Sequence, residues 1–218
     1  MWLQRYISLP MRILILATIL VVAGCASSGP KQAESSREDK DVVAGEQALL
    51  ADIPPQVQTM FERAVAIMAG GDFVDAELRL KEFLLLYPAY PGAHVNLAII
   101  HAQNGDVEGA QAAIDAALAL NPTHPAALNQ QGMLFRKNGK FIEAEAAYLK
   151  AVTASPDYAL AHYNLGVLNE LYLQRLDIAL QHFQIYQELV GNDKQVEKWI
   201  ADLTRRVAAS QHTANVAE

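Results

Sequence analysis

The sequence predicts an all-α protein in which a pair of helices is repeated to form a solenoid. Apolar residues make up 52% of the 218 residues and aromatic residues only 7%, so the hydrophobic content is mainly Ala, Leu, Val and Ile, which favours helices. Small residues and prolines recur at a spacing of 34 residues from about residue 57 onward. A separate apolar segment at the N-terminus precedes the only cysteine, Cys25.

The charge of the chain excludes one large class of function. The 17 Lys and Arg residues are outnumbered by 24 Asp and Glu residues, and the net charge is −7. A nucleic-acid-binding domain needs a basic surface, so we expect no nucleic-acid partner. The single cysteine excludes an intramolecular disulfide framework and a structural zinc site made of several cysteines.

Residues 1–24 have the features of an export signal. Residues 13–23 carry no charge, follow Arg5 and Arg12, and end in small residues directly before Cys25. This apolar run is shorter than the roughly 20 residues that a transmembrane helix needs. Translation from Met1 and translation from Met11 both leave an arginine ahead of the apolar run, so the start site stays open.

The end of this segment resembles the lipobox of bacterial lipoproteins, which it matches at Val22, Ala23, Gly24 and Cys25. The resemblance implies cleavage between Gly24 and Cys25, a diacylglyceryl group on the Cys25 thiol and an acyl group on the new amino terminus. Several acyl chains anchor a protein stably, whereas one chain does so only marginally. No other cofactor is expected. The alternative, an incidental or buried free cysteine, lacks a core in which the thiol would lie.

The residues after the cysteine indicate a location. Neither Ala26 nor Ser27 is the aspartate that retains such lipoproteins in the inner membrane, so the resemblance implies lipid anchoring at the periplasmic face of the outer membrane. Cleavage removes Arg5 and Arg12, which leaves 15 basic against 24 acidic residues and a net charge of −9.

Residues 25–55 are expected to form a flexible, lipid-anchored tether. The stretch SSGPKQAESSREDKD mixes charges with Ser, Gly and Pro and has no apolar periodicity, so burial cannot offset the entropy of ordering it. Residues 42–53 are more apolar, and a short helix that packs against the domain is one interpretation of them. Pro54 and Pro55 then precede the regular part of the chain.

Several columns of equivalent residues share the spacing of 34. They are Pro88, Pro122 and Pro156; Ala76, Ala110 and Ala144; and Ala64, Ala98, Gly132 and Gly166. The pattern resembles the tetratricopeptide repeat (TPR) family, in which two antiparallel helices cross at small residues and a proline closes each unit. The resemblance implies a right-handed superhelical solenoid of about four TPR units over residues 56–191, at about 57–90, 91–124, 125–158 and 159–191.

The fourth unit contains one additional residue. Leu165 and Gly166 stay in register with the earlier units, but the next small residue, Ala179, follows Ala144 by 35 residues. We expect the insertion in the turn before Leu176, which lacks glycine. Gly191 stands where the closing proline is expected.

A capping helix is predicted after the repeats, at residues 192–209. This segment has one apolar stripe, which predicts an amphipathic helix that begins at the N-cap Asp193 and covers the end of the solenoid. The stripe contains Val196, Trp199, Ile200, Leu203 and Val207. Residues 210–218 are expected to be a disordered tail.

The first helix of each unit lines the concave face of such a solenoid, so a column on these helices is a candidate peptide groove. The column contains Glu62, Asn96, Gln130 and Asn164, and amide side chains both donate and accept hydrogen bonds, as pairing with a peptide backbone requires. Apolar residues beside it are expected to form pockets: Phe61, Val95, Ile99, Met133, Tyr163 and Val167. The alternative is that the amides bond only within the repeat stack.

No motif for catalysis or metal binding accompanies the repeats. No histidine is followed by Glu as in HExxH, and the GxSxG and P-loop motifs are absent. His94 and His162 occupy equivalent positions in two units, which favours a structural role. We therefore expect no enzyme, no metal site and no small-molecule substrate.

Together these features predict an outer-membrane lipoprotein that presents a TPR groove in the periplasm and binds an envelope protein or an extended peptide. By analogy of architecture, we expect a scaffold in envelope assembly, similar to the pilotin-type and pilus-assembly lipoproteins that serve secretins. Two alternatives are an adaptor for peptidoglycan hydrolases or proteases, and an accessory of an envelope energy-transducing transport system.

Overall fold

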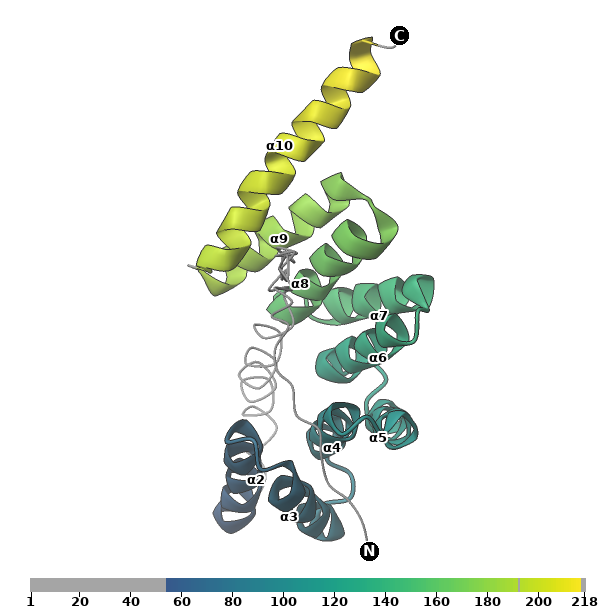
Figure 1. Cartoon of the computed structure of the whole chain (residues 1–218). Coiled ribbons are helices and arrows are strands. Elements are labelled where there is room, and N and C mark those ends of the chain that lie inside the picture. Colours follow the sequence, from purple (N-terminus) through teal and green to yellow (C-terminus); the bar gives the residue numbers. More distant parts are fainter. Residues whose placement is uncertain (1–53, 192, 217–218) are drawn as a thin grey trace, which may run out of the picture.

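The computed structural model describes residues 54–191 and 193–216, which are mostly helical (Figure 1). The elements are α2 (Pro55–Ala69), α3 (Phe73–Leu86), α4 (Pro91–Gln103), α5 (Val107–Leu120), α6 (Pro125–Lys137), α7 (Phe141–Ala154), α8 (Ala159–Leu168), the π-helix η1 (Asn169–Leu173), α9 (Leu176–Val190) and α10 (Lys194–Val216). The predicted export signal, the lipidation site Cys25 and the tether up to residue 53 lie outside the described residues. No helix in the described part is long and apolar enough to cross a membrane.

Consecutive helices pack as pairs: α2 with α3, α4 with α5, α6 with α7, and α8 with α9. Figure 1 shows these pairs stacked along a curved path, with α4, α6 and α8 on the inner side and α5 and α7 on the outer side. Each inner helix also contacts the inner helix of the next pair. This arrangement confirms the predicted all-α repeat solenoid of about four units with a further helix at its C-terminal end.

Proline and aspartate set where the helices begin. α2, α4 and α6 start with a proline, which suits the first turn because its missing N–H would have no helical partner. The outer helices α3 and α5 are capped by aspartates: Asp72 accepts a hydrogen bond from the Asp75 N–H at 3.1 Å, and Asp106 accepts one from the Gly109 N–H at 2.9 Å.

The two helices of a unit approach each other at small residues. The alanines at the first crossing position of each outer helix are fully buried: Ala76, Ala110, Ala144 and Ala179. The inner helix contributes Ala64, Ala98, Gly132 and Gly166 in successive units. A Cβ atom added to Gly132 would lie 2.5 Å from the ring of Tyr148, and one added to Gly166 would lie 2.7 Å from the ring of Phe183.

The size of the inner residue follows the size of the outer residue opposite. In the first two units the inner residue is Ala, and the outer helix places Leu80 or Ile114 at the position that is Tyr148 in the third unit and Phe183 in the fourth. All four of these outer residues are buried. Because the interior is close-packed, a larger ring on one helix requires a smaller residue on the other.

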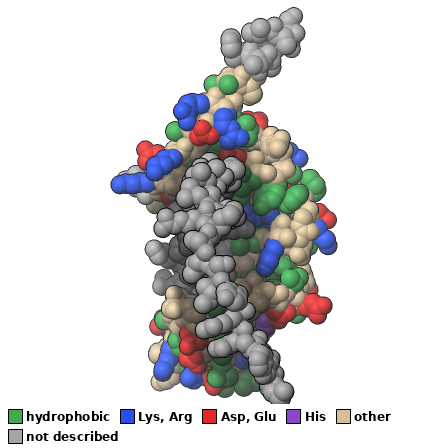
Figure 2. All heavy atoms as spheres, in the orientation of Figure 1, with side chains coloured by type: hydrophobic (Ala, Val, Ile, Leu, Met, Phe, Trp, Pro, Cys, Tyr) green, Lys and Arg blue, Asp and Glu red, His purple; other side chains and the backbone are tan. Residues whose placement is uncertain are grey.

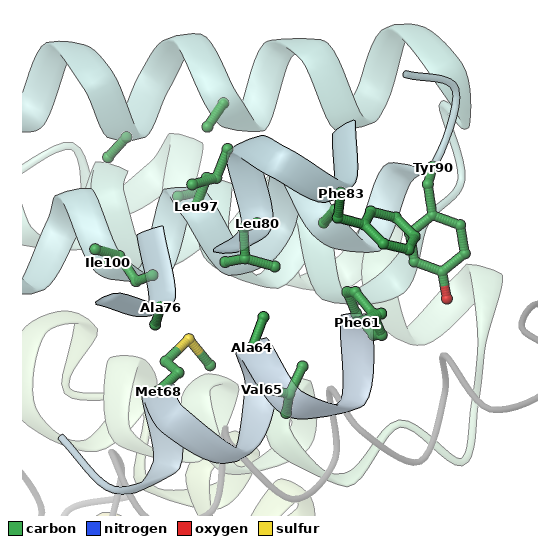
Figure 3. Packing of buried hydrophobic residues seen from close by; sticks show 14 of the residues in the cluster. Phe61, Ala64, Val65, Met68, Ala76, Leu80, Phe83, Tyr90, Leu97 and Ile100 are labelled. Carbon is green, nitrogen blue, oxygen red and sulfur yellow. The ribbon is translucent and has the colours of Figure 1, made fainter. Parts of the chain in front are cut away.

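The first unit is joined to the second by an aromatic cluster (Figure 3). Phe61 of α2 lies 5.2 Å from Phe83 of α3, between ring centroids, and 5.1 Å from Tyr90, the residue that precedes α4. Phe83 and Tyr90 are 5.3 Å apart, so the three rings form a closed set. The two edge-to-face pairs, both made by Tyr90, each add about 0.5–1.5 kcal/mol beyond the area that they bury.

The turn within the fourth unit differs from the other three. Gly71, Gly105 and Gly139 take positive φ angles between the helices of the first three units. In the fourth unit the additional residue is absorbed by η1, and Gln174 takes the positive φ, at 55°. α9 begins at Leu176, where the sequence places the counterpart of Phe141 at the start of α7.

α10 packs against α9 and covers the end of the solenoid. Trp199 lies 5.5 Å from Phe183 between ring centroids, and Val196 and Leu203 are buried in the same cluster. Asp193 caps the helix, because its carboxylate accepts hydrogen bonds from the backbone N–H groups of residues 195 and 196 at 2.9 and 3.2 Å.

The end of α10 corrects one expectation. The helix continues to Val216, so the predicted boundary at residue 209 is too early, and the disordered tail predicted for 210–218 is wrong for residues 210–216. The segment contains neither Gly nor Pro, and the two alanines 208 and 209 have high helix propensity, so nothing in it ends the helix. Figure 1 shows this part of α10 extending beyond the repeats.

The close approach in the third unit can be tested with Gly132→Ala. The added methyl group would overlap the Tyr148 ring, and overpacking of this kind lowers the free energy of unfolding by about 1–3 kcal/mol. Gly132→Ala with Tyr148→Ile recreates the combination found in the second unit and should recover part of the loss. Urea unfolding followed by circular dichroism measures both, and equal stability of Gly132→Ala and the parent would contradict the packing described here.

Candidate functional site

The structure places most of the predicted groove residues in the interior. Glu62 is exposed and Met133 is partly exposed, whereas the other eight are buried: Phe61, Val95, Asn96, Ile99, Gln130, Tyr163, Asn164 and Val167. The apolar and the amide members of this set have different surroundings.

The apolar side chains predicted to form pockets pack against neighbouring helices. Val95 and Ile99 of α4 share a cluster with alanines of α5 and α6. Tyr163 and Val167 of α8 share a cluster with α9 and α10, and Tyr163 lies 6.1 Å from Trp199 between ring centroids. Phe61 belongs to the aromatic cluster of the first unit. These positions connect one unit to the next rather than line a groove.

The amides lie on a different side of the inner helices. On α4, Ala98 belongs to the cluster that includes Ala110 and Ile114 of α5, so this side faces the outer helix. Asn96 precedes Ala98 by two residues, about 200° around the helix, and so lies on the side turned away from α5. Gln130 and Asn164 hold the equivalent positions on α6 and α8. We call these three residues the amide column.

Hydrogen bonding within the repeat stack satisfies one polar group of the amide column, the Nδ2 group of Asn164. The Asn164 Nδ2 group donates to the Oδ1 atom of Asn129 at 2.9 Å, a bond between α8 and α6. Asn96 has no partner for Nδ2 or Oδ1 among the described residues, and the same holds for Nε2 of Gln130 and Oδ1 of Asn164. A buried polar group without a partner costs about 1–3 kcal/mol. The column therefore has unmet capacity both to donate and to accept hydrogen bonds.

Charge is divided between the inner and outer helices. α4, α6 and α8 contain no Asp or Glu, and α6 ends with Arg136 and Lys137. Lys137 donates from Nζ to the carbonyl of Ala102 at 3.2 Å, at the C-terminal end of α4. The outer helices α3, α5, α7 and α9 all carry carboxylates. The inner face is thus free of carboxylates in three units although the chain as a whole is acidic.

A second concentration of basic residues lies away from the amide column. Figure 2 shows Lys and Arg side chains gathered over α10, whose sequence supplies Lys194, Lys198, Arg205 and Arg206. Arg206 forms an ion pair with Glu170 of η1 at 2.7 Å, which ties α10 to the fourth turn. This part of the surface is therefore partly engaged in holding the cap.

Two histidines hold the inner helices to the prolines that precede them. His94 Nε2 lies 3.3 Å from the carbonyl of Pro88, and His162 Nε2 lies 3.1 Å from that of Pro156. A carbonyl only accepts, so Nε2 of His162 carries the proton and its Nδ1 is an acceptor. His182 of α9, which lies 3.1 Å away between Nδ1 atoms, must then donate. In the second unit, Ala113 occupies the position that corresponds to His182.

Burial disfavours the protonated forms of this pair. Burial, and then the proximity of His162, lower the pKa of His182 to about 4. Burial also lowers the pKa of His162, against the opposite effect of its bond to Pro156. The sequence could not indicate His182, because no other unit has a histidine at the equivalent position. Across residues 54–191 and 193–216, no group of three His, Cys, Asp or Glu side chains is arranged to hold a metal ion.

Comparison with known proteins identifies the repeat. Residues 67–132 match a family model described as tetratricopeptide repeat, and residues 132–171 match one described as TPR repeat. The Pseudomonas aeruginosa pilF structure is 22% identical with a TM-score of 0.63, over 70% of this chain and 69% of that chain. A thermophilic TPR protein of Thermus thermophilus is 20% identical with a TM-score of 0.60, over 80% of this chain and 94% of that chain.

MamA from Desulfovibrio magneticus RS-1 is 21% identical with a TM-score of 0.55, over 76% of this chain and 95% of that chain. At these identities the likeness shows a shared fold. No curated protein matches the chain in sequence.

The histidine pair predicts a specific dependence of stability on pH. Both pKa values lie below the unfolded value of 6.5, so the unfolded chain binds more protons, and stability falls as the pH decreases from about 6.5 toward 4. His182→Ala recreates the combination of the second unit and should reduce this fall. Melting midpoints measured from about pH 7.5 to about pH 4.5 would show a shallower slope for the variant, and parallel slopes would contradict the assignment.

Proposed function

Because residues 67–171 of this chain are tetratricopeptide repeats, we propose that the protein is a non-catalytic scaffold that binds another protein through the concave face of its solenoid. Proteins built from such repeats generally mediate protein–protein interactions through extended concave surfaces. The chain is an outer-membrane lipoprotein in this proposal and works in the periplasm. Its partner is an envelope protein that offers an extended segment.

The amide column is the observation that carries this proposal. Asn96, Gln130 and Asn164 recur at 34-residue steps on the inner helices, and each has at least one side-chain atom without a partner among the described residues. A peptide backbone presents N–H and C=O groups at regular intervals, so it supplies both kinds of partner whatever its side chains are. The column therefore suits recognition of a main chain.

Lipid anchoring of the scaffold is supported by the match at residues 22–25, where the thiol of Cys25 would carry the diacylglyceryl group. Residues 26–53 separate this cysteine from the start of the described domain. A flexible chain of that length has an end-to-end distance of roughly 30 Å. The tether would thus hold the repeats in the periplasm close to the membrane, without requiring them to lie on its surface.

A role in envelope assembly, of the kind that pilus and secretin biogenesis require, is the pathway that we favour. It is supported by the combination of an acylation motif, a tether and a small binding solenoid in one chain. Secretin or pilin genes beside this gene would strengthen that assignment. Murein hydrolase genes or proton-channel genes in their place would favour another envelope pathway.

The groove can be tested with Asn96→Ala combined with Gln130→Ala. Removing amides that have unpaired atoms should leave the melting midpoint within a few degrees of the parent, because the lost packing is offset by the loss of buried unsatisfied groups. The same change should abolish capture of envelope proteins from crosslinked cells. Circular dichroism and quantitative mass spectrometry of the captured proteins measure the two effects.

The matched control for this variant is Gln181→Ala with Gln184→Ala, which removes two exposed amides from the outer helix α9. It should retain every captured protein. A large fall in helicity of the Asn96/Gln130 variant, or equal loss of capture in both variants, would show that the amide column is structural.

Lipid anchoring has a direct test in Cys25→Ala. The variant offers no thiol to the acylation machinery, so the chain should stay as the unprocessed precursor and incorporate no radiolabelled palmitate. Cys25→Ser replaces the thiol by a hydroxyl of similar size and should behave in the same way. Labelling of either variant at the level of the parent would overturn the assignment of the lipobox.

A further inference from the structure

We propose that the concave face is an intramolecular docking site, occupied by residues 42–53 of the same chain until a partner displaces them. This inference rests on the proposed function, because it concerns the same amide column. The inference names the segment that occupies the concave face. The sequence of this segment then indicates the chemistry that a competing partner must have.

The first argument is the unmet hydrogen bonding of the inner face. Asn96 is 0% exposed and Gln130 is 4% exposed, and yet three of their side-chain atoms have no partner among the described residues. Their counterpart Asn164 is satisfied only through Nδ2. Buried polar side chains without hydrogen-bond partners are unfavourable unless a polypeptide or water supplies the missing hydrogen bonds.

The neighbouring described helices do not supply those bonds to Asn96. On α4, Leu97 and Ile100 pack toward the first unit, Val95 and Ile99 pack toward the third, and Ala98 faces α5. Asn96 lies between these contacts, on the remaining side of the helix. A partner for its amide must therefore approach across the concave face.

The second argument is complementary charge. The inner helices α4, α6 and α8 carry no carboxylate, and α6 carries Arg136 and Lys137. Residues 42–53, VVAGEQALLADI, contain the two carboxylates Glu46 and Asp52 and no Lys or Arg. A basic segment would find no carboxylate on α4, α6 or α8, whereas an acidic one meets the positive charge of Lys137, whose Nζ group donates a hydrogen bond to a carbonyl.

The composition of the segment also separates it from the rest of the tether. Residues 42–53 contain two Val, two Leu and one Ile, whereas residues 26–41 have no large apolar residue and carry the basic residues of the tether, Lys31, Arg37 and Lys40. The acidic, apolar part is thus the part next to the solenoid. Only this part combines apolar area with a charge opposite to that of α6.

The third argument is reach. Residue 53 is followed directly by Pro54, the N-cap of α2, so the segment starts at one end of the inner face. Twelve residues extend over at most about 40 Å. Packed helices lie about 8–10 Å apart, so the path from α2 to α8 is about 30 Å. Because the segment is tethered at this site, its effective concentration is in the millimolar range, and a weak intrinsic affinity suffices.

A partner segment must then outcompete this internal occupant. It would share the chemistry of residues 42–53, with branched apolar side chains and a carboxylate but no basic residue. The internal segment raises the threshold for partner binding by the factor 1 + K, where K is the equilibrium constant for its docking.

The experiment uses residues 25–218, expressed without the export signal and with Cys25→Ser, so that a single introduced cysteine, Asn96→Cys, reports on the concave face. Leu49→Asp with Leu50→Asp should release the segment and raise the rate at which a thiol reagent modifies residue 96 by at least tenfold. The matched control, Leu85→Asp with Leu86→Asp, makes the same change on exposed residues of α3 and should leave that rate unaltered. Circular dichroism verifies that every variant stays helical.

A synthetic peptide of residues 42–53 provides the second measurement. It should bind saturably to the released Leu49/Leu50 variant, and Arg136→Glu with Lys137→Glu should weaken that binding at least fivefold. An unchanged rate of thiol modification together with no peptide binding would overturn the inference. The proposed function would still stand in that case if partner capture depended on Asn96 and Gln130. If the peptide bound but no partner protein were captured, the inference would stand and the proposed function would fail.

Discussion

The whole structure depends on how closely the two helices of each unit can approach. That distance is set by one residue on each helix: a buried alanine on the outer helix and Ala or Gly on the inner one. Where the outer helix carries the ring of Tyr148 or Phe183, the inner residue is Gly, so no Cβ atom occupies the space that the ring needs. Each unit therefore keeps a similar thickness with different side chains, and regular stacking follows.

Stacking then decides which side of an inner helix is left for recognition. α4 is in contact on one side with its own outer helix and on two others with the neighbouring units. The remaining side holds the amide column, and α4, α6 and α8 carry no carboxylate. In the second to fourth units the helical acidic residues thus lie on the outer helices and η1, whereas α2 of the first unit carries Glu62. None of them places a carboxylate on α4, α6 or α8, where it would repel an anionic segment.

The sequence was sufficient to predict the repeat, but not to predict the directions in which its side chains point. Spacing predicted the helix pairs, the capping by Asp193 and the extra residue before Leu176, because caps, prolines and small residues act locally. A column at 34-residue steps shows that positions are equivalent, but not whether they face a ligand or the next unit. Phe61, Val95 and Tyr163 were expected beside a groove, and the structure buries them in clusters between helices. His182, η1 and the length of α10 have no repeated counterpart, so no column could reveal them.

The fourth unit and α10 also limit how the repeat array can grow. Its 35-residue step is absorbed by η1 and by the left-handed Gln174, so this unit is not interchangeable with the three before it. The aromatic surface that it presents beyond α9 is matched to Trp199, and a duplicated unit inserted there would have to replace that contact. Lengthening by tandem duplication is therefore tolerated best among the first three units, and the length of the groove can evolve without disturbing its C-terminal closure.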